Sequence, residues 1–102
     1  MILLYEIVDC DIEILDNKAV CVLYVMNSLR ASKRIQMSVS NLTKFLKCMD
    51  CQRLEQTIAK TIRCKVNDHL KITHISRMHL DTDEWIVGRE VANEVWGLYS
   101  IW

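Results

Sequence analysis

The chain has 102 residues, of which 51% are hydrophobic and 25% charged, and its 13 basic residues balance 13 acidic ones. This length predicts one domain, residues 1–102, and the composition is apolar enough to fill a core, which excludes a disordered chain. A net charge of zero argues against a protein that mainly grips nucleic acid or an anionic membrane, because both need a positive excess. Two glycines and no proline exclude the glycine-rich loops that bind phosphate groups.

Neither a membrane span nor a secretory signal is expected. No apolar run reaches the length of about 18 residues that a spanning helix needs. The N-terminus lacks a basic region and a small-residue cleavage site. We therefore expect a cytoplasmic protein whose five cysteines are mainly reduced.

Alternating and apolar stretches predict three strands in the first part of the chain. Residues 2–15 alternate between two sets of side chains, which is the period of a strand. Asp16-Asn17-Lys18 predicts a hairpin turn, because Asp and Asn tolerate the left-handed conformation. The apolar, β-branched run 19–26 is expected at the centre of the sheet, and residues 33–39 alternate again.

A helix and two further strands are predicted in the middle of the chain. Ser40 is the expected N-cap. The apolar residues after it have the spacing of one helix face: Leu42, Phe45, Leu46 and Met49. Residues 61–66 and 70–80 predict the strands, and Asn27 and Asn67 are each expected to begin a turn.

The C-terminal segment predicts an amphipathic helix that opens at Asp81, with Glu84 at capping-box spacing. At about 100° per residue, one stripe of this helix collects apolar residues, including all three tryptophans. Its members are Trp85, Gly88, Val91, Ala92, Val95, Trp96, Tyr99 and Trp102.

Two stretches of the chain have the same pattern. Residues 34–42 and 77–85 align without a gap, and each runs from a basic residue through alternating positions to a helix cap. An internal duplication, with units at approximately 19–50 and 60–102, is one interpretation; two unrelated stretches are the other. The predicted fold class is α+β, an antiparallel sheet with helices packed on one face, arranged as two pseudo-symmetric ββα units if the duplication holds.

In its length and in these two paired segments, the chain resembles the small orphan proteins of archaeal filamentous viruses. The resemblance involves no signature motif. It implies an accessory protein of a virus or mobile element that acts in the host cytoplasm. Five cysteines and five methionines depart from the composition of a hyperthermophile, in which labile residues tend to be reduced.

Two groups of residues suggest chemistry. Cys48 and Cys51 form half of a zinc motif, but the usual second pair is missing, so structural thiols are the preferred interpretation. Three carboxylates alternate along the first strand, where they would hold a hard cation, form a solvated face or inhibit edge pairing: Asp9, Asp11 and Glu13. No catalytic constellation is assembled in the sequence, so we expect neither an enzyme nor a cofactor.

The predicted function is a protein- or peptide-interaction module, with a homodimer as one form. The expected contacts are made by aromatic residues of the C-terminal stripe, since Trp and Tyr dominate interface hot spots: Trp85, Trp96, Tyr99 and Trp102. Exposed sheet edges offer a second route, in which a partner adds a strand. Two alternatives remain open: a small nucleic-acid-binding regulator that uses Arg30, Lys33 and Arg34, and a zinc-stabilised domain built on Cys48 and Cys51.

Overall fold

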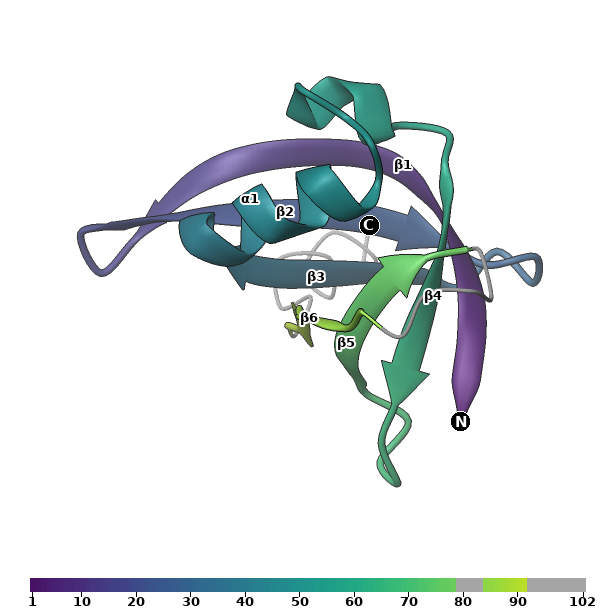
Figure 1. Cartoon of the computed structure of the whole chain (residues 1–102). Helices are drawn as coiled ribbons and strands as arrows, with labels where there is room; N and C mark the ends of the chain where they lie inside the picture. The colour runs from purple at the N-terminus through teal and green to yellow at the C-terminus, as the bar shows by residue number, and fades with distance from the viewer. Residues whose placement is uncertain (79–83, 92–102) are drawn as a thin grey trace, which may run out of the picture.

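Antiparallel strands make up most of the structure, a computed structural model that describes residues 1–78 and 84–91 (Figure 1). One α-helix and one 3-10 helix interrupt the strands. The elements are β1 (Ile2–Leu15), β2 (Lys18–Met26), β3 (Ser32–Ser38), α1 (Val39–Cys48), η1 (Leu54–Thr57), β4 (Thr61–Val66), β5 (Ile72–Arg77), β6 (Ile86–Val87) and β7 (Arg89–Glu90).

The seven strands form one sheet that closes on itself. Their order is β6-β5-β4-β1-β2-β3-β7, in which β4-β1-β2-β3 is a Greek key. The two outermost strands are neighbours in the chain, because only Gly88 separates β6 from β7. β6 pairs with β5 and β7 pairs with β3, so this short segment joins the two ends of the sheet.

Gly88 permits the segment to change its pairing partner. The residue is buried, and a Cβ atom there would lie 3.0 Å from Cγ2 of Ile35 and 3.5 Å from Cδ1 of Ile75. These two isoleucines belong to the strands that the segment bridges. A Cβ at position 88 would therefore press against Ile35 of β3 and make an ordinary van der Waals contact with Ile75 of β5.

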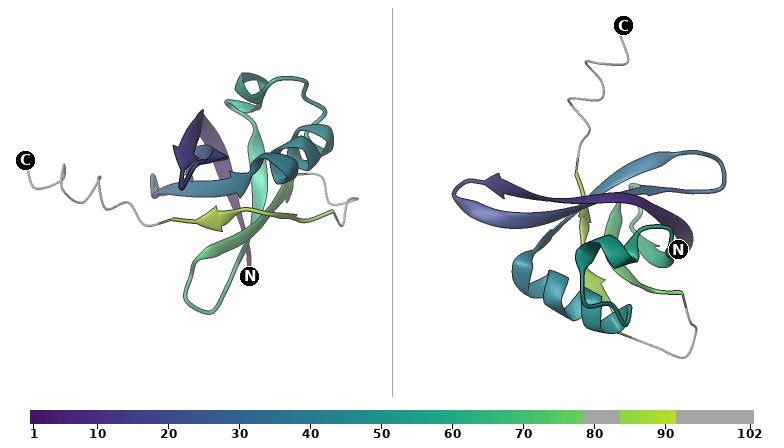
Figure 2. Two further views of the ribbon diagram at one scale, coloured as in Figure 1. Left: turned by 90° about the vertical axis from the view of Figure 1, so that its left-hand side faces the viewer. Right: turned by 90° about the horizontal axis from the view of Figure 1, so that it is seen from above.

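The core lies inside the closed sheet. Alternate residues of the strands point into it, as the period of two requires. α1 adds Phe45, Cys48 and Met49, and contacts β2, β3, β5 and β6 (Figure 2). The strand residues of the core are Tyr5, Ile7, Cys21, Leu23, Val25, Ile35, Met37, Ile62, Cys64, Val66, Ile72, Ile75 and Ile86.

Most of the predicted strands and turns before residue 78 are confirmed. Asp16 and Asn17 adopt φ of 50° and 65°, as the hairpin prediction requires. Asn27 and Asn67 begin turns of the same design: each Oδ1 accepts hydrogen bonds from the backbone N–H groups two and four residues later, at 2.9–3.0 Å. The side-chain oxygen thus satisfies two amides that the turn would leave without a backbone acceptor.

The N-cap of the helix of the first half lies two residues before the predicted N-cap. Ser38, not Ser40, caps α1, because its Oγ accepts from the N–H of Asn41 at 3.2 Å. The helix ends in a Schellman motif, in which Asp50 has φ of 56° and the Cys51 N–H donates to the carbonyl of Leu46 at 2.9 Å. This left-handed residue turns the chain at the end of α1.

The predicted fold class is wrong: the chain is β-rich, and its one described α-helix does not make it an α+β fold with helices covering a sheet. Residues 85–91, expected to begin the C-terminal helix, instead contain β6 and β7, so the two ββα units are not formed as predicted. The side chain of Ile86 lies in the core, and Gly88 lies where the sheet closes. The pairing of this segment with β5 and β3 determines both positions. Asp81 and the remainder of the stripe (Ala92, Val95, Trp96, Tyr99 and Trp102) lie outside the described residues.

Candidate binding edge

The two parts of β1 have different neighbours. Residues 2–6 pair with β4, and residues 6–15 pair with β2. Val8 has no partner in β2, because Ile7 pairs with Val25 and Asp9 with Tyr24, which defines a β-bulge. From residue 9 to residue 15, β2 is the only described strand that pairs with β1, and we call these seven residues the free edge.

The bulge determines which backbone groups point outward along the free edge. Ile7 turns its N–H and C=O away from β2, toward Lys60 O at 2.9 Å and Ala59 N at 2.7 Å. Alternation with one extra residue then turns Cys10 and Ile12 the same way. Their N–H groups donate instead to the Oδ1 atoms of the preceding residues, Asp9 and Asp11, at 2.8 Å each.

The side chains of the free edge divide into an apolar and an acidic face. Cys10 lies across from Leu23 and Ile12 across from Cys21, so both are on the face that continues the core. Ile12 is 47% exposed and Ile14, which follows it on the same face, is 69% exposed. The opposite face carries three carboxylates: Asp9, Asp11 and Glu13. The tip of this β1–β2 hairpin extends beyond the rest of the sheet (Figures 1 and 2).

Only one of these carboxylates is neutralised by a nearby cation. Glu13 forms an ion pair with Arg34, whose guanidinium also lies 5.9 Å from the centre of the Tyr24 ring. Among the described residues, no Lys or Arg lies within ion-pair distance of Asp9 or Asp11. Burial, and after it the charges of Asp9 and Glu55, raises the pKa of the Cys10 thiol. The free edge is therefore an acidic strand edge with an exposed aliphatic face.

Trp85 is the one predicted partner-binding residue that lies within the described part of the chain. Its ring is half-buried, and the Arg63 guanidinium and the Lys65 ammonium both lie 4.8 Å from its centre. Arg63 is itself buried and donates from Nε to the carbonyl of Arg77 at 2.8 Å. Trp85 thus packs on two cations of β4, a contact that the sequence did not reveal. Trp96, Tyr99 and Trp102 lie outside the described residues.

The basic residues of the nucleic-acid alternative are close in sequence but differently engaged. Arg30 is exposed in the β2–β3 turn at φ of 62°. Lys33 pairs with Glu90 at 3.5 Å, and Arg34 pairs with Glu13. Two of the three cations are therefore already beside a carboxylate, which weakens their attraction for phosphate.

The cysteines provide no described metal site. All five are free thiols. Cys48 is buried 3.9 Å from Oγ of Ser76, and Sγ of Cys51 lies 3.5 Å from the carbonyl oxygen of Met49. Within residues 1–78 and 84–91, no three His, Cys, Asp or Glu side chains gather to hold a metal ion. Burial raises the pKa of both Cys21 and Cys64 to about 12, which keeps these thiols protonated.

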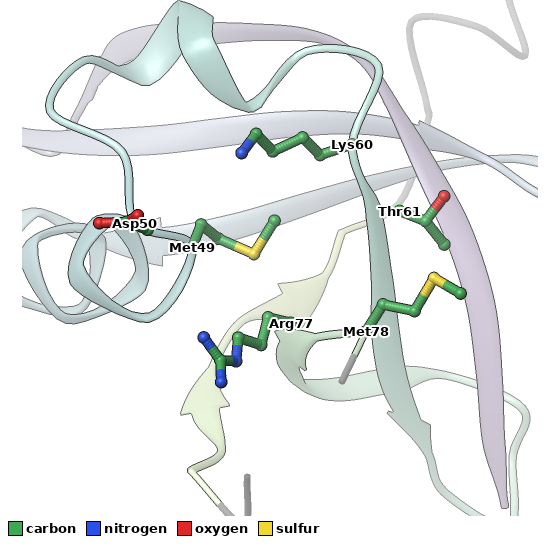
Figure 3. Close-up of a pocket in the computed structure, with 6 residues that line it drawn as sticks. All are labelled: Met49, Asp50, Lys60, Thr61, Arg77 and Met78. Atoms are coloured by element: carbon green, nitrogen blue, oxygen red, sulfur yellow. The ribbon is translucent and has the colours of Figure 1, made fainter. Parts of the chain in front are cut away.

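A cavity of about 420 Å³ lies where the end of α1 approaches β4 and β5. Figure 3 shows its lining residues: Met49, Asp50, Lys60, Thr61, Arg77 and Met78. The charged groups of Lys60 and Arg77 lie on opposite sides of Met49 in this view, so they do not converge on one anion. The six lining residues that the structure describes are not arranged for nucleophilic or acid–base chemistry.

Sequence reasoning did not single out Ile12 and Ile14 as exposed contact residues. The available signal was the length of the first strand, since 14 residues far exceed the five or six that are usual. A strand this long extends past its neighbours and leaves one edge open.

No helix in the described residues has the length and apolar character of a membrane span. No protein-family model matches the chain, and neither a curated protein nor a solved structure shows detectable similarity to it.

Proposed function

We propose that this chain is a non-enzymatic protein-interaction module that binds an extended segment of another polypeptide along the free edge. The observation that carries the proposal is the contrast between this edge and the point where the sheet closes between β5 and β3. Residues 86–91 close the sheet between β5 and β3, whereas residues 9–15 keep seven consecutive positions with β2 on one side only. An added strand forms backbone hydrogen bonds with such an edge, and alternate side chains provide specificity.

The geometry of the free edge suits an added strand. Cys10 and Ile12 direct N–H groups outward, and the C=O groups of the same residues point the same way in an antiparallel strand. Ile12 and Ile14 flank these groups with exposed aliphatic surface. Burial of that surface by a partner contributes roughly 25 cal/mol per Å² before the cost of ordering the partner is subtracted.

The rival surface is less suited to binding. The cations that contact the Trp85 ring are supplied by the chain itself, so part of the ring's surface is used in the fold. Lys33 and Arg34 are paired with carboxylates. Among the described strands, residues 2–5 of β1 also pair on one side only, with β4, but the free edge is the longer run and combines outward N–H groups with an acidic and an aliphatic face.

A proline at position 12 tests the proposal. Ile12→Pro removes an N–H that faces away from β2, so the β1–β2 ladder keeps its hydrogen bonds while the edge loses a donor and gains a ring that obstructs pairing. Ile12→Thr is the matched control, because it keeps the N–H and the β-branched shape.

The measurement begins with peptides selected against the whole wild-type chain from a random library of dodecapeptides. We expect their affinities, measured by fluorescence anisotropy, to fall more than tenfold for Ile12→Pro and only a few-fold for Ile12→Thr. Mapped alkylation of Cys10, slowed by bound peptide, reports the same contact without any substitution. Failure to select a peptide, or equal binding to the wild type and to Ile12→Pro with no protection of Cys10, would overturn the proposal.

A further inference from the structure

The chemistry of the free edge specifies the kind of segment that fits it. Asp9 and Asp11 hold the outward N–H groups of Cys10 and Ile12 through their carboxylate oxygens. An incoming strand must supply carbonyl oxygens to these N–H groups, and the two carboxylates then lose their donors. A carboxylate that gives up a charge-assisted hydrogen bond needs a replacement, and Lys or Arg on the incoming strand supplies one.

The opposite face of the same edge requires the opposite chemistry. Ile12 and Ile14 lie on the apolar face, next to the partly buried Cys10. A strand paired here presents successive side chains to the two faces in turn. Its residues on the face of the aspartates must be basic, and those on the face of the isoleucines must be aliphatic.

A second copy of this chain does not meet that requirement. A two-fold antiparallel pairing centred on Ile12 would place Asp11 directly across from the second copy's Glu13, twice in one interface. Like charges directly opposite each other destabilise a strand pair. The nearby Glu55, whose charge acts on Cys10, adds to the negative potential.

Resting on the proposed function, we infer that the free edge binds a segment of another protein in which Lys or Arg alternates with aliphatic residues. The carboxylates of Asp9 and Asp11 act as a selective guard on this edge. In the isolated chain the two carboxylates accept the hydrogen bonds of the outward N–H groups, which inhibits pairing with most strands. A strand with its own Lys or Arg side chains can replace these hydrogen bonds and pair with the N–H groups.

Three blocked octapeptides test the inference on the whole chain: one alternates lysine and valine, one alternates glutamate and valine, and one contains four lysines followed by four valines. We expect the first to bind at least tenfold more tightly than either of the others, with a difference from the glutamate peptide that shrinks in 1 M salt. The double substitution Asp9→Lys with Asp11→Lys should reverse the preference between the two alternating peptides. Both positions are exposed, so these variants should fold, and circular dichroism checks that they do.

The outcomes separate this inference from the proposed function. Library peptides that need the Ile12 N–H but show no preference for lysine over glutamate would overturn the inference and leave the binding edge standing. Equal binding of the alternating and block lysine peptides would show attraction by charge alone and would also overturn it. A solution mass of two chains that Ile12→Pro reduces to one would identify a second copy as the occupant and refute the basic partner. Library peptides that bind the wild type and Ile12→Pro with equal affinity would instead refute binding at the free edge.

Discussion

The two parts of β1 differ in their neighbours, although they belong to one strand. Residues 2–6 pair with β4, Ile7 bonds the segment at residues 59–60, and the side chains of Tyr5 and Ile7 enter the core. Residues 9–15 pair with β2 alone and leave Ile12 and Ile14 exposed. The change occurs at one residue, the bulged Val8. One strand thus contributes both to the closed sheet and to a surface available for binding.

This difference also separates stability from function within one element. Tyr5 and Ile7 of the first part are buried, so substitution of either changes the free energy of unfolding. Ile12 and Ile14 of the second part are exposed, so substitution of either should change binding with little effect on stability.

The largest difference in the free energy of unfolding is expected between truncations of two isoleucines, one in each part of β1. Ile7 is fully buried, so Ile7→Ala should lower the free energy of unfolding by about 2–5 kcal/mol. Ile14→Ala, at a position 69% exposed, should change it by about 0.5 kcal/mol or less. Urea denaturation of the two variants gives both values. Similar losses would show that the outer part of β1 is packed and not free.

Two buried thiols test whether the core excludes water equally well beneath both parts of β1. Cys64 lies across from Leu3, Cys21 lies across from Ile12, and burial raises the pKa of each from 9.0 to about 12. Because the folded chain holds these protons more tightly, their stabilising contribution is complete below pH 9 and is lost as pH rises toward 12. Each thiol should lower the free energy of unfolding by up to about 1.4 kcal/mol per pH unit in that window.

Denaturation at pH 8, 9 and 10 measures this slope, with Cys21→Ala and Cys64→Ala as separate variants. Each variant should unfold with a shallower pH dependence than the wild type, by a similar amount. A smaller change for Cys21→Ala than for Cys64→Ala would place water beneath the outer part of β1.

Substitution of a lysine beside each part of β1 should give a smaller difference in the free energy of unfolding. Lys65 pairs with Ile2 and places its ammonium 4.8 Å from the centre of the Trp85 ring. Lys65→Ala should therefore destabilise the fold by about 0.5–1 kcal/mol, the value of an exposed cation–π contact. Lys18 pairs with Leu15 at the hairpin tip, and Lys18→Ala should have a smaller effect. Equal effects in thermal denaturation would contradict a structural role for the contact with Trp85.

The elements before residue 78 could be predicted because their signals are local. The hairpin at Asp16 and Asn17 follows from residues that tolerate positive φ, and the apolar face of α1 follows from the spacing of Phe45 and Met49. The strands alternate in the sequence as they alternate in the sheet. Such patterns depend on neighbours along the chain, which a sequence displays directly.

The closure and the binding edge depend instead on contacts distant in sequence. Trp85, Gly88 and Val91 fit a helical stripe, yet the same segment pairs with β5 and β3, which lie far from it in the sequence or carry no local signal for this pairing. The alternating carboxylates of the first strand allowed edge inhibition as one interpretation. The position of the bulge, which the sequence does not display, is what lets Asp9 and Asp11 accept hydrogen bonds from the N–H groups that point away from β2.

The smallest predicted effect on stability carries the sharpest information about the boundary. Asp11→Ala removes the acceptor of the Ile12 N–H at an exposed site, so the free energy of unfolding should change by less than about 0.5 kcal/mol. The exchange of that amide hydrogen with solvent should nevertheless become several-fold faster, since opening it no longer breaks a hydrogen bond. The amide of Ile7, which donates to the Lys60 carbonyl, should keep its exchange rate and serves as the internal control. If the Ile12 amide of the wild type exchanged as slowly as that of Ile7 and ignored the loss of Asp11, another part of the chain would cover the edge, and no partner strand could pair there.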